Sequence, residues 1–267
     1  DGWQMLQVRC PTFRVMHEDG WAGLLDLNGN IMQESLFALR ENLLVDQPKS
    51  QTNVLVSLTQ AAPDGGDSLL VSAVKRLSDR LGITVQQAAH AWVDAYCQQV
   101  LKPLFTAEAD YGLVLLAHQQ NILVQMLGDL PVGFIYRDCQ GSAFMPHATD
   151  WLDSIGEAQA ENIFTHEQLL RYFPYYLLVN STFAVTAALG AAGLDSESNL
   201  MARVRASLAE VRDQVTHKTC LNYVLESPYW NVKGNFFCYL NDHNENTIVD
   251  PSVIYFDFAN PLQAQEV

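Results

Sequence analysis

Residues 111–141 constrain the fold of this chain more than any other part of its sequence. Two short runs rich in branched and aromatic residues, 122–126 and 132–136, flank a segment, 127–131, that contains the glycine, aspartate and proline typical of a turn. This pattern predicts a β-hairpin. Because the strands of a hairpin run antiparallel, residues just before the first strand and just after the second should lie together at its open end.

Polar residues stand at both of these positions. His118, Gln120 and Asn121 precede the first strand, and Arg137 and Asp138 follow the second. A carboxylate and an amide oxygen are hard donors that suit Mg²⁺, which needs only one or two protein ligands beside phosphates and water. Protein kinases use an Asn and an Asp in this way, although the catalytic-loop Asp of kinases is missing here. The set predicts a metal–nucleotide site in which Asn121 and Asp138 hold Mg²⁺ while His118 and Gln120 contact ATP.

Each of these residues also has a purely structural explanation. His118 can cap a helix, Asn121 can make a turn, and Asp138 can begin a loop. Taken one at a time, the residues are explained by those roles. The spacing of the whole set and its apolar flanks favour a site.

The charge balance limits the partners of the chain. With 15 Lys and Arg against 30 Asp and Glu, the formal net charge is −15, which repels nucleic acid and anionic membranes. We therefore expect no nucleic-acid partner and no membrane partner. A site for an anionic ligand must gather positive charge from a small stock, so Arg137, Arg171, Lys218 and Lys233 become candidates.

The remaining composition indicates a folded intracellular protein. Hydrophobic residues make up 49% of the chain and charged residues 17%, which excludes disorder. The five cysteines are odd in number and widely spaced, so neither a zinc ribbon nor a disulfide framework is indicated, and a reducing cytoplasm fits. No apolar run reaches about 18 residues, and no signal-peptide pattern opens the sequence.

Local patterns predict an α+β fold. Strands are expected at 5–9, 13–17, 21–27 and 53–58, and helices at 33–44, 68–80, 84–101, 106–116, 175–192 and 200–217. Thr84 is a plausible N-cap, and the helix that it begins is expected to stop before Lys102-Pro103. Residues 61–67 and 242–250 should be loops, and 257–262 a closing tail. The arginines at 203, 205 and 212 are expected to face solvent, as are Arg40 and Glu41.

Two segments of the sequence resemble a known family. Residues 117–121, AHQQN, and 137–141, RDCQG, are similar to the paired motifs EAHxQN and RDFxG of siderophore synthetases that work without a peptide synthetase assembly line, the aerobactin-synthetase type. The resemblance runs from Trp92 to Leu262, and more loosely back to Arg40. It covers most of this chain but only the carboxy-terminal half of such an enzyme.

The resemblance implies a fold, an activity and partners. Family members are built as fingers, palm and thumb, so residues 1–150 are expected to form a kinase-like palm with a mixed or antiparallel sheet, and 151–267 a largely helical thumb with a terminal hairpin or tail. ATP would lie in the palm. The implied reaction activates a carboxylate, commonly citrate, as an acyl-adenylate that an amine or alcohol captures. The amino-terminal half would supply further contacts, and the family commonly forms homodimers.

Not every residue of the family's motifs is present in this sequence. Three positions depart from the family pattern: Leu116 stands where the family has Glu, Ser181 where it often has His, and Tyr239 where it has Arg. Lys233 keeps the family's cation, so Arg137 and Lys233 are expected to offset anionic charge, with His118 as a third catalytic residue.

Two other classes of protein stay open. The carboxy-terminal region of the family also resembles ferric-siderophore reductases, which need a cysteine cluster that the isolated Cys220 and Cys238 do not form. The three departures are also compatible with a non-catalytic relative that has kept the fold as a binding or partner module.

Overall fold

The predicted hairpin lies at the centre of the main sheet. A computed structural model describes residues 2–43, 51–150, 162–234, 238, 240 and 251–263. In it, β6 (Ile122–Leu127) pairs antiparallel with β7 (Leu130–Tyr136). The connection is tighter than the sequence predicted, because Gly128 and Asp129 alone form the turn, with φ of 56° and 65°. Positive φ at both central residues is what two-residue hairpin turns require.

The hairpin belongs to a mixed four-stranded sheet. Its strand order is β1 (Phe13–Val15), β7, β6, β4 (Gln51–Val54), with β1 parallel to β7 and the other pairs antiparallel. Alternate residues of β6 point to opposite faces. Val124 belongs to the main buried cluster, whereas Leu123 packs with Leu43 and Ile135 in a small second cluster. Both faces of the hairpin are therefore covered.

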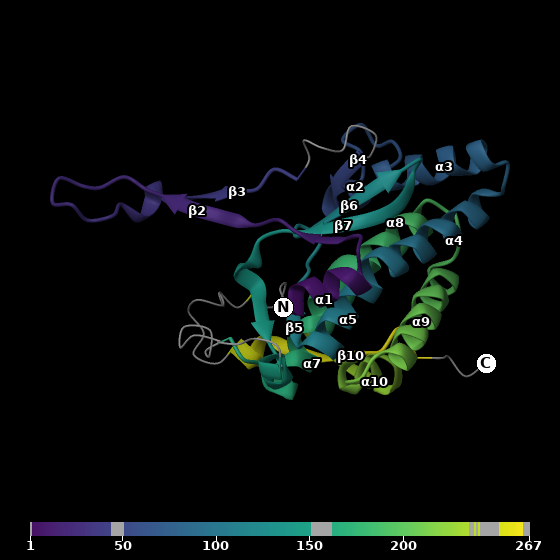
Figure 1. The fold of residues 1–267 in the computed structure, drawn as a ribbon. Coiled ribbons are helices and arrows are strands. Elements are labelled where there is room, and N and C mark those ends of the chain that lie inside the picture. Colours follow the sequence, from purple (N-terminus) through teal and green to yellow (C-terminus); the bar gives the residue numbers. More distant parts are fainter. Residues whose placement is uncertain are drawn as a thin grey trace.

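Helices pack against this sheet, and Figure 1 shows most of them on one side of it. The helices of the described residues are α1 (Gly2–Arg9), α2 (Leu55–Thr59), α3 (Leu69–Leu81), α4 (Val85–Tyr96), α5 (Lys102–Tyr111), α7 (His166–Pro174), α8 (Phe183–Ala191), α9 (Glu197–Gln214) and α10 (Thr219–Glu226). Ser68 and Thr84 cap α3 and α4 through their side chains. The predicted α+β class is confirmed.

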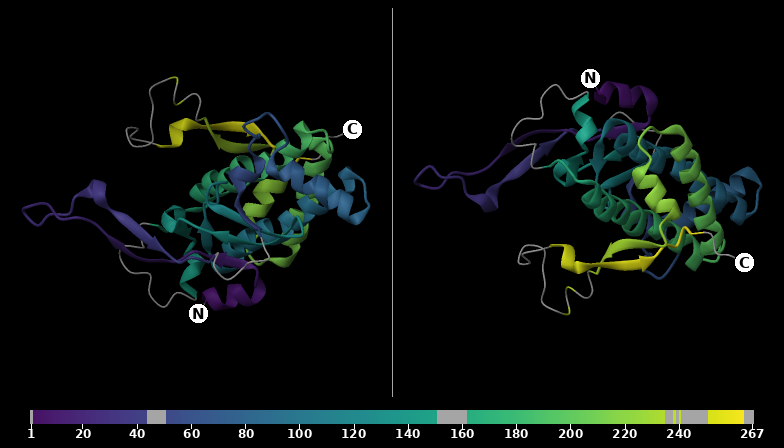
Figure 2. Two further views of the ribbon diagram at one scale, coloured as in Figure 1. Left: turned by 90° about the horizontal axis from the view of Figure 1, so that it is seen from above. Right: turned by 90° about the horizontal axis from the view of Figure 1, so that it is seen from below.

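Three two-stranded ribbons complete the described strands. They are β2 (Glu18–Ala22) with β3 (Phe37–Arg40), β5 (Leu113–Leu115) with β8 (Ser142–Phe144), and β9 (Tyr229–Lys233) with β10 (Tyr255–Ala259), all antiparallel. The two views of Figure 2 place the β2–β3 ribbon and the β9–β10 ribbon on opposite sides of the molecule. The predicted tail at 257–262 is thus partly a strand.

Two prolines that should end helices do not. The helix that starts at Val85 continues through a π-helical turn, Cys97–Leu101, into α5, where Pro103 lies in the first turn. Pro174 likewise sits inside a helix, and a long π segment, Tyr175–Thr182, follows it before α8. A wider turn beside a proline accommodates the ring and the missing N–H. The prediction that the helix stops before Lys102 was therefore wrong.

Most of the other errors lie in the first third of the chain. Residues 5–9 are helical in α1, whereas the described part of the predicted helix at 33–44 contains a 3₁₀ turn, Gln33–Ser35, followed by β3 (Phe37–Arg40). The predicted strand at 53–58 ends at Val54 and continues as α2, and the predicted helix at 106–116 ends at Tyr111. The leucines that suggested a helical stripe at 36 and 39 are exposed instead, so no core selects the helical period there.

The arginines of α9 are also not where they were expected. Arg203 pairs with Asp94 of α4, Arg205 donates to the carbonyls of Leu225 and Leu262, and Arg212 pairs with Glu226 of α10. They tie α9 to its neighbours. Helical periodicity alone does not show whether an arginine on the polar face of a helix points into solvent or pairs with a neighbouring element.

The main buried cluster extends from Leu6 to Leu262, across residue 150. The division into a palm at 1–150 and a thumb at 151–267 stays a prediction. The predicted loop at 242–250 and Tyr239 lie outside the described residues. Among the described helices, none is long and apolar enough to cross a membrane.

Candidate functional site

The loop that precedes β6 is bound to the end of β7. The backbone N–H of Arg137 donates to the carbonyl of Asn121 at 3.1 Å, and the Arg137 Nε donates to the carbonyl of Gln120 at 3.0 Å. The N–H of Asn121 closes the loop by donating to the carbonyl of His118 at 2.8 Å. The antiparallel pairing thus brings the two motifs to one end of the hairpin.

The π segment fixes the other side of this loop. Ser181 Oγ donates to the carbonyl of Ala117 at 2.8 Å and also contacts the carbonyl of Tyr176, and the Gln119 N–H donates to Asn180 Oδ1 at 3.4 Å. π-helical turns often occur at functional sites. The departure at Ser181 therefore has a structural role in this chain, since the serine holds the loop that carries His118.

Replacing Ser181 with alanine should cost about 1 kcal/mol of unfolding free energy, because the buried hydrogen bond from its hydroxyl to the carbonyl of Ala117 is lost. Thr186→Ala is the control, since Thr186 is also buried but its hydroxyl bonds to Phe183 of the same helix and to the Met201 sulfur of α9, away from the site loop. Urea unfolding of both variants measures the difference. If the Ser181 variant loses no more than the control, the serine does not hold the loop.

Two adjoining cavities open at this end of the hairpin. The larger, about 510 Å³, is lined by Arg40, Val54, Val56, Ser57, His118, Gln120, Asn121, Arg137 and Asp138. The smaller, about 310 Å³, is lined by Leu116, His118, Asn121, Asp138, Gly141 and Tyr176. His118, Asn121 and Asp138 line both. Five of the six residues predicted for the site thus lie around one cavity.

The sixth residue lies elsewhere. Lys233 is the last residue of β9, opposite Tyr255 of β10, and it lines neither of the two cavities. Its proposed catalytic role stays a prediction.

Asp138 has an unusual backbone. Its φ is 69° and its ψ 71°, in the left-handed region that Asp and Asn tolerate better than other side chains. Its carboxylate is 43% exposed and lies 3.6 Å from the Arg40 guanidinium, which is closer to Glu18 at 2.8 Å. The carboxylate is therefore accessible from the cavity and only loosely paired.

Arg40 is a residue of the cavity that the sequence pattern did not predict. It was expected to face solvent on a helix, but it is the last residue of β3, and it lines the larger cavity. The weak similarity to the family at Arg40-Glu41 was the available signal. The charged residues that line this cavity are then two arginines and one aspartate, which suits an anionic ligand in a chain of formal net charge −15.

His118 is a neutral group in this site. Burial lowers its pKa, the nearby Arg137 lowers it further, and Asp138 offsets part of the shift. The N–H of Gln120 donates to His118 Nδ1 at 3.3 Å, so the ring proton is on Nε2. A neutral imidazole with an Nε2–H can donate to a ligand oxygen.

A buried tyrosine, Tyr136, ends β7 one residue before Arg137. Burial raises the pKa of Tyr136, and the side chains of Asn121 and Ser142 act in the opposite direction. Its hydroxyl therefore stays protonated.

The donor set fits a hard cation. Asp138 offers an accessible carboxylate and Asn121 an amide oxygen on the same cavity, and Mg²⁺ commonly takes no more than this from a protein. Among the described residues, no group of three or more His, Cys, Asp and Glu is placed to hold a metal. A Mg²⁺ ion that takes its other ligands from phosphates and water does not need such a group.

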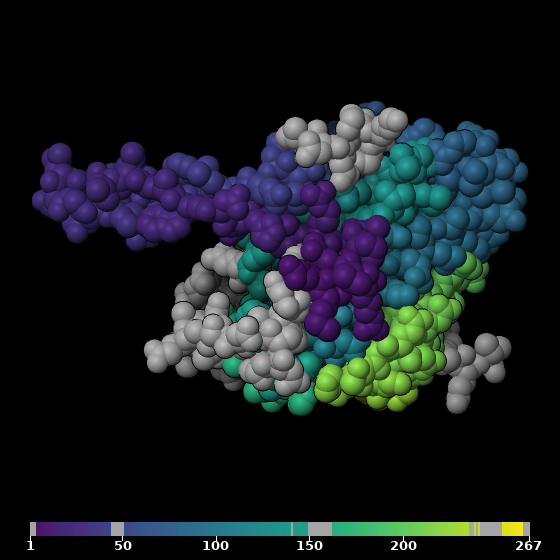
Figure 3. All heavy atoms as spheres, in the orientation of Figure 1, coloured from purple at the N-terminus to yellow at the C-terminus, as the bar shows by residue number. Residues whose placement is uncertain are grey.

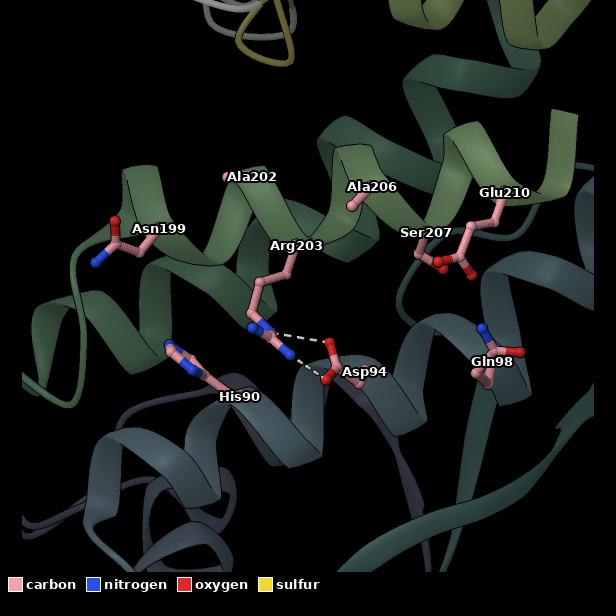
Figure 4. Close-up of a pocket in the computed structure, with 9 residues that line it drawn as sticks. All are labelled: His90, Asp94, Gln98, Asn199, Ala202, Arg203, Ala206, Ser207 and Glu210. Carbon is pink, nitrogen blue, oxygen red and sulfur yellow. Dashed lines mark hydrogen bonds and ion pairs between the residues drawn. The ribbon is translucent and has the colours of Figure 1, made fainter. Parts of the chain in front are cut away.

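A larger cavity lies far from these residues. It measures about 650 Å³, runs between α4 and α9, and is lined by His90, Asp94, Gln98, Asn199, Ala202, Arg203, Ala206, Ser207 and Glu210 (Figure 4). Its arginine and histidine already have partners, because Arg203 pairs with Asp94 and His90 Nε2 lies 2.6 Å from Asp195 Oδ2. Size alone does not make it the functional site.

Comparison with known proteins identifies the family. The family model described as "Ferric iron reductase FhuF-like transporter" matches residues 90–248. N(2)-citryl-N(6)-acetyl-N(6)-hydroxylysine synthase of Escherichia coli is 91% identical over 100% of this chain and 47% of that protein. The synthase of the same name from Vibrio mimicus is 43% identical over 95% of this chain and 43% of its own length.

A solved structure agrees. ATP-bound aerobactin synthetase IucA from a hypervirulent pathotype of Klebsiella pneumoniae matches with a TM-score of 0.91 and 88% identity, over 99% of this chain and 46% of that one. The chain therefore belongs to the FhuF-like family. It also belongs to the siderophore synthetases of the aerobactin type, which the two motifs predicted. It spans about half the length of the relatives that it matches.

Proposed function

We propose that this chain is the ATP-binding half of a ligase in siderophore biosynthesis. The reaction activates citrate or a related polycarboxylate by adenylation and condenses it with an amine or alcohol. The observation that carries the proposal is the meeting of His118, Gln120, Asn121, Arg137 and Asp138 around one cavity. The names of the similar proteins, a citryl-hydroxylysine synthase and an ATP-bound aerobactin synthetase, support it.

The proposed roles follow from the chemistry of each side chain. Asp138 and Asn121 hold Mg²⁺, whose charge would offset that of the triphosphate. The neutral His118 and Gln120 donate hydrogen bonds to ATP. Arg137 lines the same cavity, so its guanidinium can pair with the negative charge of a phosphate or carboxylate. Lys233 is proposed to act in the same way in the complete enzyme.

The complete enzyme requires more than this chain. Since the chain spans only 47% of its Escherichia coli relative, further phosphate and carboxylate contacts belong to the other half. The chain alone is expected to bind ATP weakly and to turn over no substrate. A cytoplasmic location and a homodimer of the full-length protein are parts of the same proposal.

Replacing Asp138 with asparagine should weaken ATP binding in the presence of Mg²⁺ by on the order of tenfold, about 1.4 kcal/mol, because the carboxylate that opposes the metal charge is lost. Asparagine tolerates the same positive φ, so the backbone is preserved. Isothermal titration of ATP into the full-length protein, with and without Mg²⁺, measures the effect. The loss should be smaller without the metal.

Asp129→Asn is the matched control for this experiment. Asp129 has a φ of 65°, undergoes the same chemical change, and lies at the other end of the hairpin, where it pairs with Arg76 and Arg80. Its substitution should leave ATP affinity unchanged. Equal affinities for the parent and the Asp138 variant would remove Asp138 from the site.

Two alternatives are separated by other observations. The name of the matched family model includes ferric iron reduction, which favours a reductase as the second candidate. Cys10, Cys97 and Cys220 are buried and Cys139 is exposed, and the five cysteines are widely separated in the sequence. The names of the full-length relatives favour the synthetase. Citrate-dependent release of pyrophosphate from ATP by the full-length protein would distinguish an enzyme from a non-catalytic relative.

A further inference from the structure

The β2–β3 ribbon projects from the rest of the molecule. In Figures 1 and 3 it stands away from the sheet and the helices, joined to them only at its base. A two-stranded ribbon is marginally stable in water by itself. Within the described residues both of its outer edges are unpaired, because β2 and β3 pair only with each other.

Large apolar side chains are exposed along the whole ribbon and its tip. They are Trp21, Leu24, Leu25, Leu27, Ile31, Met32, Leu36, Phe37 and Leu39. The exposed large apolar residues of the other described segments are scattered over several elements, whereas these nine fall within nineteen consecutive positions. Contiguous exposed apolar surface of this kind marks an interface.

The register places apolar side chains on both faces of the ribbon. Trp21 pairs with Ala38, and Ala22 pairs with Phe37, so Trp21 and Phe37 point to opposite faces. A flat two-fold contact with a second copy buries the same patch on each subunit, so it would cover one face of the ribbon and leave the other in water. Whatever covers the ribbon must enclose both faces.

The base of the ribbon is continuous with the candidate site. Arg40, the last residue of β3, lines the larger cavity and lies between Glu18 of β2 and Asp138 of the second motif. A segment seated on the ribbon would therefore also border the open side of the cavity. The relatives provide such a segment, since about half of their length is not spanned by this chain.

We propose that the β2–β3 ribbon is the docking surface for the other half of the full-length protein, which pairs with its free edges and encloses its two apolar faces. The proposed occupant is this intramolecular segment, not a second copy. Strand addition to open edges supplies backbone hydrogen bonds, and the alternating apolar side chains supply the buried area.

Hydrogen exchange tests the proposal on native proteins. Backbone amides of residues 18–40 should exchange at least about tenfold more slowly in the full-length protein than in the 267-residue chain, because docking pairs and buries them. This protection should persist through about a hundredfold dilution, since an intramolecular contact does not depend on concentration. Equal exchange in both proteins would overturn the proposal, as would protection that is lost on dilution.

A matched pair of variants gives a second readout. Leu39 on the ribbon is 56% exposed and Leu69 at the start of α3 is 54% exposed. Leu39→Asp should lower the melting temperature of the full-length protein and leave that of the 267-residue chain unchanged, whereas Leu69→Asp should lower neither. If the two substitutions have the same effect in the full-length protein, the ribbon is not a docking surface.

Discussion

Replacing Glu108 with glutamine should stabilise this protein at pH 8.5 by on the order of 4 kcal/mol and have little effect near pH 4.5. Glu108 lies in α5 and is 2% exposed, and its Oε2 has no hydrogen-bond partner among the described residues. Burial, with a smaller contribution from Asp110, raises the pKa of this carboxyl to about 8. A neutral acid is thus held in the core.

The direction of the pH dependence follows from where the proton is lost. The unfolded chain releases the proton of Glu108 near pH 4.5, while the folded protein keeps it up to about pH 8. Between these values the unfolded state gains by ionising and the folded state does not, so stability falls as the pH rises. The glutamine side chain does not ionise in this range, so the variant does not lose stability in this way as the pH rises.

Urea unfolding from pH 4.5 to pH 8.5, followed by tryptophan fluorescence, measures the difference between variant and parent at each pH. Glu210→Gln is the control, because it makes the same chemical change at an exposed position on α9. The stabilisation by Glu108→Gln should grow with pH, whereas that of the control should not. A difference that stays constant across the range would contradict a neutral buried Glu108.

The site could be approached from the sequence because its geometry is local. Once residues 122–136 are recognised as a hairpin, antiparallel pairing alone brings Asn121 and Arg137 to the same end, where the structure joins their backbones. The helix cap at Thr84 was equally accessible, because a cap depends on residues within one turn.

What the sequence could not show depends on contacts between distant segments. Arg40 reaches the cavity only because β3 belongs to a ribbon, and the leucines at 36 and 39 have a spacing that fits a helix as well as exposed β structure. The contacts of Ser181 with the site loop arise from a π segment, which has no reliable sequence signature. These features are set by tertiary packing.

Replacing Gly112 with alanine should destabilise the protein by about 3 kcal/mol or more, through left-handed strain and a steric clash. Gly112 ends α5 with a φ of 65°, and a Cβ there would lie 2.8 Å from the backbone nitrogen of Ala148 and 2.9 Å from its Cβ. Since Ala148 is fully buried, neither group can move aside without a backbone shift.

Gly82→Ala separates the two contributions. Gly82 ends α3 with nearly the same φ, 63°, but no atom lies within 4 Å of the position of its Cβ, so its substitution should cost only about 1 kcal/mol. Thermal and urea unfolding compare the two variants. Because Gly112 leads directly through β5 into the loop that carries His118, the backbone shift should also weaken ATP binding, whereas Gly82→Ala should not. Equal losses of stability in the two variants would mean that the contact with Ala148 adds nothing to the strain.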